Sequence, residues 1–145
     1  VLARWRLGRG ENPTGIAFDA ARGRIYSVCG NKTMVVLDTL GAVLATLPIG
    51  TRVDGAAFDP TTRLAYSSNG GGTMTVVREV SPKHFEVVEN VETAVGARTR
   101  ALDPTTHRVY VVTAKFGDPL PPTAERPQTR PSVMPGTFEV RVYGS

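Results

Sequence analysis

Three copies of one short pattern constrain the fold of this chain more than any other feature. In each copy an aspartate is followed seven residues later by a tyrosine, and apolar residues lie on both sides. The copies are GIAFDAARGRIY (15–26), GAAFDPTTRLAY (55–66) and TRALDPTTHRVY (99–110), so their aspartates at positions 19, 59 and 103 are 40 and 44 residues apart. Each copy predicts a strand, a turn that the aspartate side chain opens, and a second strand.

A second hairpin follows the pattern in the first two units. Its third strand is predicted in TMVVLDT (33–39) and TMTVVRE (73–79), and its fourth strand at 43–47 and 85–91. Asn31 and the run 69–72 (NGGG) are expected to supply residues that tolerate positive φ in the tight turn. Four short antiparallel strands in about 42 residues are typical of a β-propeller blade. No segment has a 3.6-residue apolar period, so we expect an all-β chain with essentially no helix.

The repeats predict a single half-propeller domain over residues 1–145. Blade 1 is expected at 13–50, blade 2 at 53–93 and blade 3 at 97–145. Blade 3 is interrupted by an insertion, 115–136, that holds six of the eleven prolines. Because proline lacks a backbone donor, we expect this insertion to be a loop lying over a blade face, with a partner-binding arm as the alternative.

The third unit lacks a fourth strand, and a matching strand is found at the other end of the chain. Residues 1–8 (VLARWRLG) align with residues 43–50 (VLATLPIG), which predicts an orphan fourth strand at 1–8. Three blades cannot close a ring, since propellers have 4–8 blades. We therefore expect a homodimer in which each N-terminal strand completes the partner's third blade and gives a six-bladed ring.

The units resemble YVTN-type β-propeller repeats of the YncE-like family. Residues 66–69 (YSSN) stand where the family has the tetrapeptide YVTN that names it, and the other two units depart further from it. The best match runs from TMVVLDT (33–39) to VLATLPIG (43–50). The resemblance covers nearly the whole chain and likens it to the C-terminal half of such a protein. It implies the fold and no particular activity. Many members are exported, but residues 1–13 have no apolar core like that of a signal peptide, so a cytoplasmic location is the default expectation.

Few side chains suited to catalysis are present. The two histidines, His84 and His107, fall in turns, and the lone Cys29 lies among apolar residues, so we expect exposed turn residues and a buried, inert thiol. The aligned aspartates are expected to cap turns and the aligned tyrosines to lie in the core. No zinc, serine-hydrolase or phosphate-loop motif is found, so no catalytic residue, metal or cofactor is predicted.

The charge of the chain permits a polyanionic partner without indicating one. The formal net charge is +4 and the isoelectric point is about 9.6, but the 17 basic residues are scattered and are not interleaved with aromatic residues. Nucleic acid is therefore an unlikely partner. No apolar run reaches the roughly 18 residues of a membrane helix, so no membrane partner is expected.

Candidate binding residues are found where the repeats differ from one another. Positions just before and within the first strand of each unit hold Arg52, Asp54, Arg98 and Arg100. In a propeller these positions surround one mouth of the central channel, where a mainly basic ring could bind a small anionic molecule. The alternative is that Asp54 pairs with Arg98 only to seal the channel.

The function predicted from the sequence is a non-enzymatic binding or scaffold protein. A lactonase-like hydrolase is the first alternative, because propellers of related shape include lactonases, although no acid, base or metal set is evident in the sequence. A weak nucleic-acid binder is the second alternative and rests only on the isoelectric point.

Overall fold

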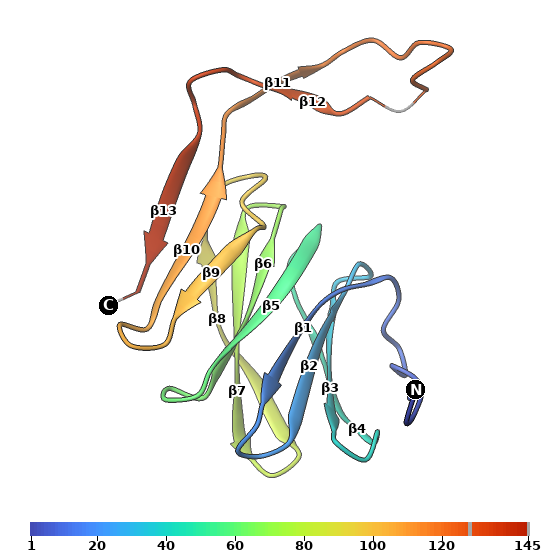
Figure 1. Cartoon of the computed structure of the whole chain (residues 1–145), viewed down its shortest axis with the longest axis vertical. Helices are drawn as coiled ribbons and strands as arrows, with labels where there is room; N and C mark the ends of the chain where they lie inside the picture. The colour runs from blue at the N-terminus through green and yellow to red at the C-terminus, as the bar shows by residue number, and fades with distance from the viewer. Residues whose placement is uncertain (128, 145) are drawn as a thin grey trace.

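A computed structural model describes residues 1–127 and 129–144. In these residues the structure is all-β, and three sheets stand side by side in an arc (Figure 1). The predicted absence of helix is confirmed for the described ranges. None of the described residues forms a helix that is long and apolar enough to cross a membrane.

The first two sheets are four-stranded antiparallel meanders, as the repeats predicted. Blade 1 has the order β1-β2-β3-β4 and blade 2 the order β5-β6-β7-β8. Their strands are β1 (Pro13–Asp19), β2 (Arg24–Cys29), β3 (Thr33–Asp38), β4 (Val43–Pro48), β5 (Val53–Asp59), β6 (Leu64–Asn69), β7 (Thr73–Ser81) and β8 (His84–Glu92). In both blades the aspartate of the repeat ends the first strand and the tyrosine lies in the second.

Blade 3 has three strands among the described residues, in the order β13-β10-β9. These are β9 (Arg100–Asp103), β10 (Arg108–Thr113) and β13 (Glu139–Tyr143). The edge of β13 that lies away from β10 pairs with no strand of the described chain. The third sheet therefore presents an open edge.

The proline-rich insertion differs from the loop that the sequence predicted. It contains a strand pair of its own, β11 (Phe116–Pro119) and β12 (Pro131–Val133), and projects beyond the ends of the sheets (Figure 1). Its large apolar side chains are exposed: Phe116, Leu120, Val133 and Met134.

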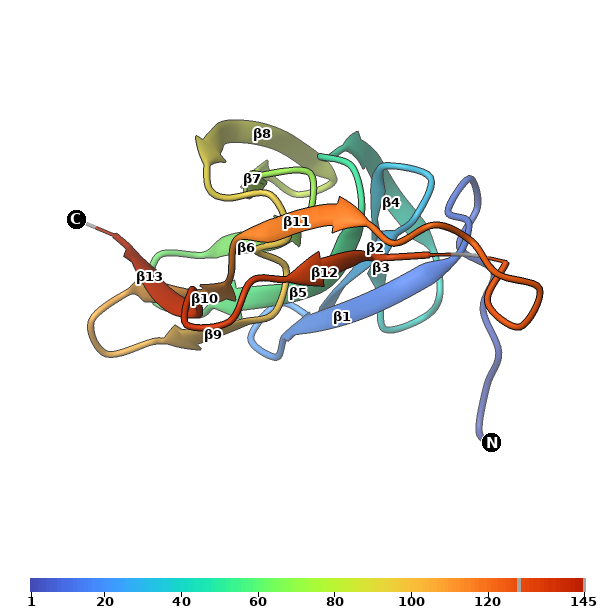
Figure 2. The ribbon, with the colours of Figure 1, turned by 90° about the horizontal axis from the view of Figure 1, so that it is seen from above.

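Residues 1–8 form no strand in the described chain, and the orphan strand remains a prediction. Val1 and Leu2 are fully exposed, and the N-terminus extends away from the body beside blade 1 (Figure 2). Leu7 packs beside Cys29, Val35 and Leu37. A strand needs a neighbour for its backbone hydrogen bonds, and no strand of the described chain pairs with this segment.

The core lies between the sheets, where the face of one blade packs on the next. Tyr26 of blade 1 is 1% exposed and stacks on Phe58 of blade 2, with ring centroids 5.5 Å apart. Tyr66 of blade 2 occupies the same place against Val109 and Val111 of blade 3. Aromatic burial of this kind is among the largest contributions a core residue makes. The prediction that the repeat tyrosines are core residues is confirmed for these two.

Each repeat aspartate caps its own turn. The Oδ1 atoms of Asp19, Asp59 and Asp103 accept hydrogen bonds from the backbone N–H groups two residues later, at 3.0, 2.9 and 2.9 Å. This confirms the turn-capping interpretation, since an Asx side chain that bonds the backbone two residues on stabilises a turn.

The turn between β2 and β3 corrects a smaller expectation. Its positive φ is at Lys32 (63°), not at Asn31. The Asn31 amide instead accepts a hydrogen bond from the Glu11 N–H at 3.1 Å and donates one to the Arg9 carbonyl at 2.7 Å. Asn31 thus fastens the segment that leads into β1.

Candidate functional site

The predicted site residues lie where the chain enters the innermost strands. The meander topology puts the loops before β5 and β9 at the same end of the sheets as the β6–β7 turn. The β11–β12 hairpin projects from this end as well (Figure 1). Arg52 and Arg98 lie in the loops, Asp54 lies in β5 and Arg100 begins β9.

Arg52 and Arg98 are brought together around the turn that follows β6. The Gly70 N–H donates a hydrogen bond to the Arg52 carbonyl at 2.9 Å. A Cβ at Gly70 would lie 3.4 Å from both the Arg52 Cβ and the Arg98 Cδ, so both arginine side chains lie close to Gly70. Both arginines are exposed.

Arg100 lies deeper, between blades 2 and 3. Its guanidinium Nη1 rests against the Cα of Gly55 and donates a hydrogen bond to the Ser68 Oγ at 3.3 Å. The Ser68 hydroxyl donates in turn to the Arg98 carbonyl. The Arg100 Nε is buried and has no hydrogen-bond partner among the described residues.

The charge of Arg100 is only partly compensated. Burial lowers its pKa, and the Asp54 carboxylate opposes that effect. In the part of the chain that the structure describes, Asp54 forms no ion pair within 4.0 Å with any of the three arginines. The pair of Asp54 with Arg98 that would seal the channel is therefore not formed in the single chain.

A buried polar network that the sequence analysis missed supports this end of blade 2. The Asn69 side chain donates to the Thr73 and Thr75 hydroxyls, both at 3.1 Å, and Thr75 donates to the Asn90 Oδ1 at 2.8 Å. These bonds fix the end of β6 from which Ser68 and Gly70 meet the arginines. A signal was present: Asn69 and Thr75 stand at the positions of Cys29 and Val35 in blade 1.

His107 is placed differently from the expectation of a simple exposed turn residue. Its Nδ1 is 2.7 Å from the Asp59 Oδ2, which joins the blade 3 turn to the blade 2 turn, and its side chain is only 39% exposed. Burial would raise the pKa of Asp59, but hydrogen bonds from Thr61, Thr62 and His107 outweigh it and lower the pKa. The pair is a link between sheets.

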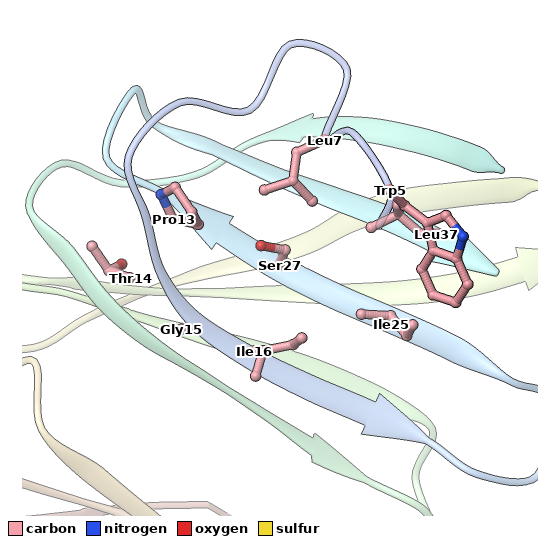
Figure 3. A pocket seen from close by; sticks show the side chains of 9 residues that line it. All are labelled: Trp5, Leu7, Pro13, Thr14, Gly15, Ile16, Ile25, Ser27 and Leu37. Carbon is pink, nitrogen blue, oxygen red and sulfur yellow. The ribbon is translucent and has the colours of Figure 1, made fainter. Parts of the chain in front are cut away.

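A groove with a volume of about 560 Å³ runs along the outer face of blade 1 (Figure 3). Most of its lining is apolar, with large side chains from Trp5, Leu7, Ile16, Ile25 and Leu37. Cys29 is buried beneath Leu7, which confirms the expected buried thiol. Within residues 1–127 and 129–144, no three His, Cys, Asp or Glu side chains are grouped so that they could hold a metal ion.

Comparison with known proteins supports the architecture alone. No family model and no curated protein matches the chain. Among solved structures, the chain is similar to hydrazine synthase of Kuenenia stuttgartiensis, with a TM-score of 0.64 and 17% sequence identity over 73% of this chain and 31% of that chain. This chain thus spans less than a third of that protein's length. Together with the four-stranded antiparallel sheets, the similarity fits a propeller-like fold.

Proposed function

We propose that the chain is a non-enzymatic β-propeller module of the YVTN-repeat type that binds a small anionic molecule at its channel mouth. The observation that carries this proposal is the state of Arg100. Arg100 is half-buried between two blades, and its buried Nε has no partner among the described residues. A buried donor without a partner costs about 1–3 kcal/mol, and more when it is charged, so a ligand that supplies the acceptor gains that free energy.

The surrounding groups favour an anion with two or more oxygens. Arg52 and Arg98 lie nearby around Gly70, and neither is within ion-pair distance of a described carboxylate. Guanidinium groups bind carboxylates and phosphates through paired hydrogen bonds, which are stronger than bonds between neutral groups. We therefore propose that a small carboxylate or phosphate compound is held between Arg100 and the two exposed arginines.

We further propose that the working form is a six-bladed ring made by two copies of the chain. The support for this assembly is the open edge of β13, the unpaired segment 1–8 and the apolar outer faces of blades 1 and 3. Such edges and faces favour association when they are left uncovered. In the ring each copy would contribute its arginines to one mouth, and the positive potential there would be doubled.

A thermal-shift series with Arg100→Met tests the binding proposal. The unsubstituted chain should gain stability in millimolar inorganic phosphate, citrate or succinate beyond the effect of sodium chloride at equal ionic strength. Arg100→Met should lose this gain, while Arg78→Met, which removes an exposed charge from β7, should keep it. An equal gain in all three proteins would overturn the role of Arg100.

A further inference from the structure

The two ends of the arc present apolar sheet faces to solvent. On blade 1, Ile16 and Phe18 of β1 are 69% and 54% exposed beside the groove of Figure 3. On blade 3, Val112 of β10 and Val140 and Val142 of β13 are 48%, 60% and 53% exposed. Figure 2 shows these blades at opposite ends of the arc. Isolated exposed apolar residues are ordinary, but a continuous face on a sheet indicates an interface.

The interface inside the chain identifies what each open face fits. Blade 1 packs on blade 2 through Tyr26, Val28, Met34 and Val36, which meet Ala56, Phe58, Ala65 and Val77. In the repeat alignment, the strand pairing makes Tyr110, Val112, Val140 and Val142 the counterparts of the first set. The counterparts of the second set are Ile16, Phe18, Ile25 and Leu37. The open face of blade 3 therefore corresponds to the face that blade 1 turns to blade 2. The open face of blade 1 corresponds to the face that blade 2 turns to blade 1.

We infer that the Tyr110 face of a second copy occupies the groove on blade 1, and that residues 1–7 pair with β13 of that copy in one defined register. This inference rests on the proposed six-bladed ring and specifies which residues of the two copies meet in it. The same two surfaces meet again on the other side of the two-fold axis, so the ring closes without leaving a free sheet edge. Side chains at both faces are then covered as Tyr26 and Tyr66 are covered within one chain.

The register follows from the way β4 pairs with β3. In blade 1, Ala45 is opposite Val36, Leu47 is opposite Met34 and Pro48 is opposite Thr33. The alignment of residues 1–8 with 43–50 converts these pairs into Ala3 opposite Val142, Trp5 opposite Val140 and Arg6 opposite Glu139. Because side chains alternate along a strand, a slip of one residue would turn Trp5 and Leu7 away from the blade 1 face that they already contact.

The charges at this edge suit the register. Glu139 is exposed and bonds the Arg141 Nε at 2.6 Å, so Arg6 of the second copy would place the carboxylate between two guanidinium groups. Arg4 would lie opposite Arg141, and the two positive charges would repel each other. The Glu89 carboxylate on β8 can offset this repulsion. Glu89 lines a cavity of about 500 Å³ between β8 and β13, where the added strand would lie. The segment thus brings Arg6 to the one carboxylate of β13.

Charge exchange tests this arrangement. Arg6→Glu and Glu139→Arg each create two like-charge contacts per dimer and should weaken dimerisation by about tenfold or more. A heterodimer of the two variants has opposite charges at both junctions, so an equimolar mixture should regain dimer close to the level of the unsubstituted chain. Analytical ultracentrifugation over a concentration series measures all four samples. A mixture as weak as the single variants would overturn the Arg6–Glu139 pairing.

Disulfide trapping separates the register from the ring itself. Ala3→Cys with Val142→Cys should form an intermolecular bond on mild oxidation, whereas Ala3→Cys with Val140→Cys should not, and Cys29 is buried in both. A stable dimer that fails to cross-link at the first pair overturns the register and leaves the proposed ring standing. A chain that stays monomeric at 15.5 kDa overturns both. The anion-binding measurement above is independent of either outcome.

Discussion

The repeat tyrosine lies on a blade face that another blade covers in blades 1 and 2, and on an uncovered face in blade 3. Tyr26 and Tyr66 are 1% and 7% exposed because another blade packs against them, whereas Tyr110, at the equivalent position of blade 3, is only half-buried. The strand position decides which face of the sheet a residue occupies. Whether that face is buried depends on a distant neighbour: Phe58 follows Tyr26 by 32 residues, and Val109 follows Tyr66 by 43.

The repeat aspartates make a similar contrast. All three cap a turn, but Asp59 is completely buried and also contacts His107 of the next blade, while Asp103 bonds only within its own turn. The same capped turn is therefore expected to contribute more to the free energy of unfolding in blade 2 than in blade 3. The difference comes from the blade that follows.

The largest effect is expected at the tyrosines. Tyr26→Ala should lower the free energy of unfolding by about 3–5 kcal/mol, because it removes a fully buried ring from the contact with Phe58 and Phe85. Tyr110→Ala should cost about 1–2 kcal/mol in the single chain, since no further blade covers this ring. Urea unfolding measures both. Equal losses in dilute, monomeric protein would show that the two faces are covered alike.

The next largest effect is expected at the aspartates. Asp59→Asn should cost about 1–3 kcal/mol, because it weakens hydrogen bonds at a buried site, and Asp103→Asn should cost less, because the bonds of Asp103 lie within an exposed turn. The pKa of Asp59 is lowered in the folded state, so its charged form contributes stability above the unfolded value of about 3.9 and loses that contribution as the pH falls below it.

Unfolding free energies between pH 7 and pH 3 check this prediction. The gap between the unsubstituted chain and Asp59→Asn should narrow below about pH 4. A gap that is constant with pH would mean that the Asp59 charge does not stabilise the fold. Asp103→Asn serves as the control for the turn alone, because its carboxylate accepts equivalent local bonds from Thr105 and Thr106.

The smallest effect is expected in the turns between the second and third strands. Lys32 (φ 63°) in blade 1 and Gly72 (φ 103°) in blade 2 hold the positive φ. Lys32→Gly should change stability by no more than about 1 kcal/mol, because relief of the left-handed conformation is offset by glycine's entropy. Gly72→Lys should lower it by about 1–2 kcal/mol, because a φ of 103° is outside the region that residues with a Cβ tolerate. Thermal unfolding of this pair compares the blades directly.

Much of the architecture could be predicted because it depends on local pattern. Alternating apolar residues, Asx turns at fixed spacing and the alignment of 33–50 with later segments are enough to locate the strands of the first two blades. The insertion was predicted less well. Six prolines indicated extended chain but did not indicate whether its apolar residues would be covered, and the β11–β12 hairpin projects from the blades.

For the candidate site, the sequence identified the residues but not their environments. It selected Arg52, Asp54, Arg98 and Arg100 because these positions vary among the repeats. It did not reveal that Arg100 is withdrawn over Gly55, that Asp54 stands apart from Arg98, or that Asn69 and Thr75 build the support beneath. His107 was predicted as an exposed turn residue, and its bond to Asp59 was missed.

The sequence by itself determined the repeat, the strand order within each blade and the turns, because these depend on side-chain periodicity and on bonds between residues two or three apart. Only the tertiary structure decided which apolar faces are covered, that Arg100 is half-buried, and that Asp59 contacts His107. Those outcomes depend on side chains from the adjoining blade, and their desolvation and hydrogen bonding exist only after the sheets have packed.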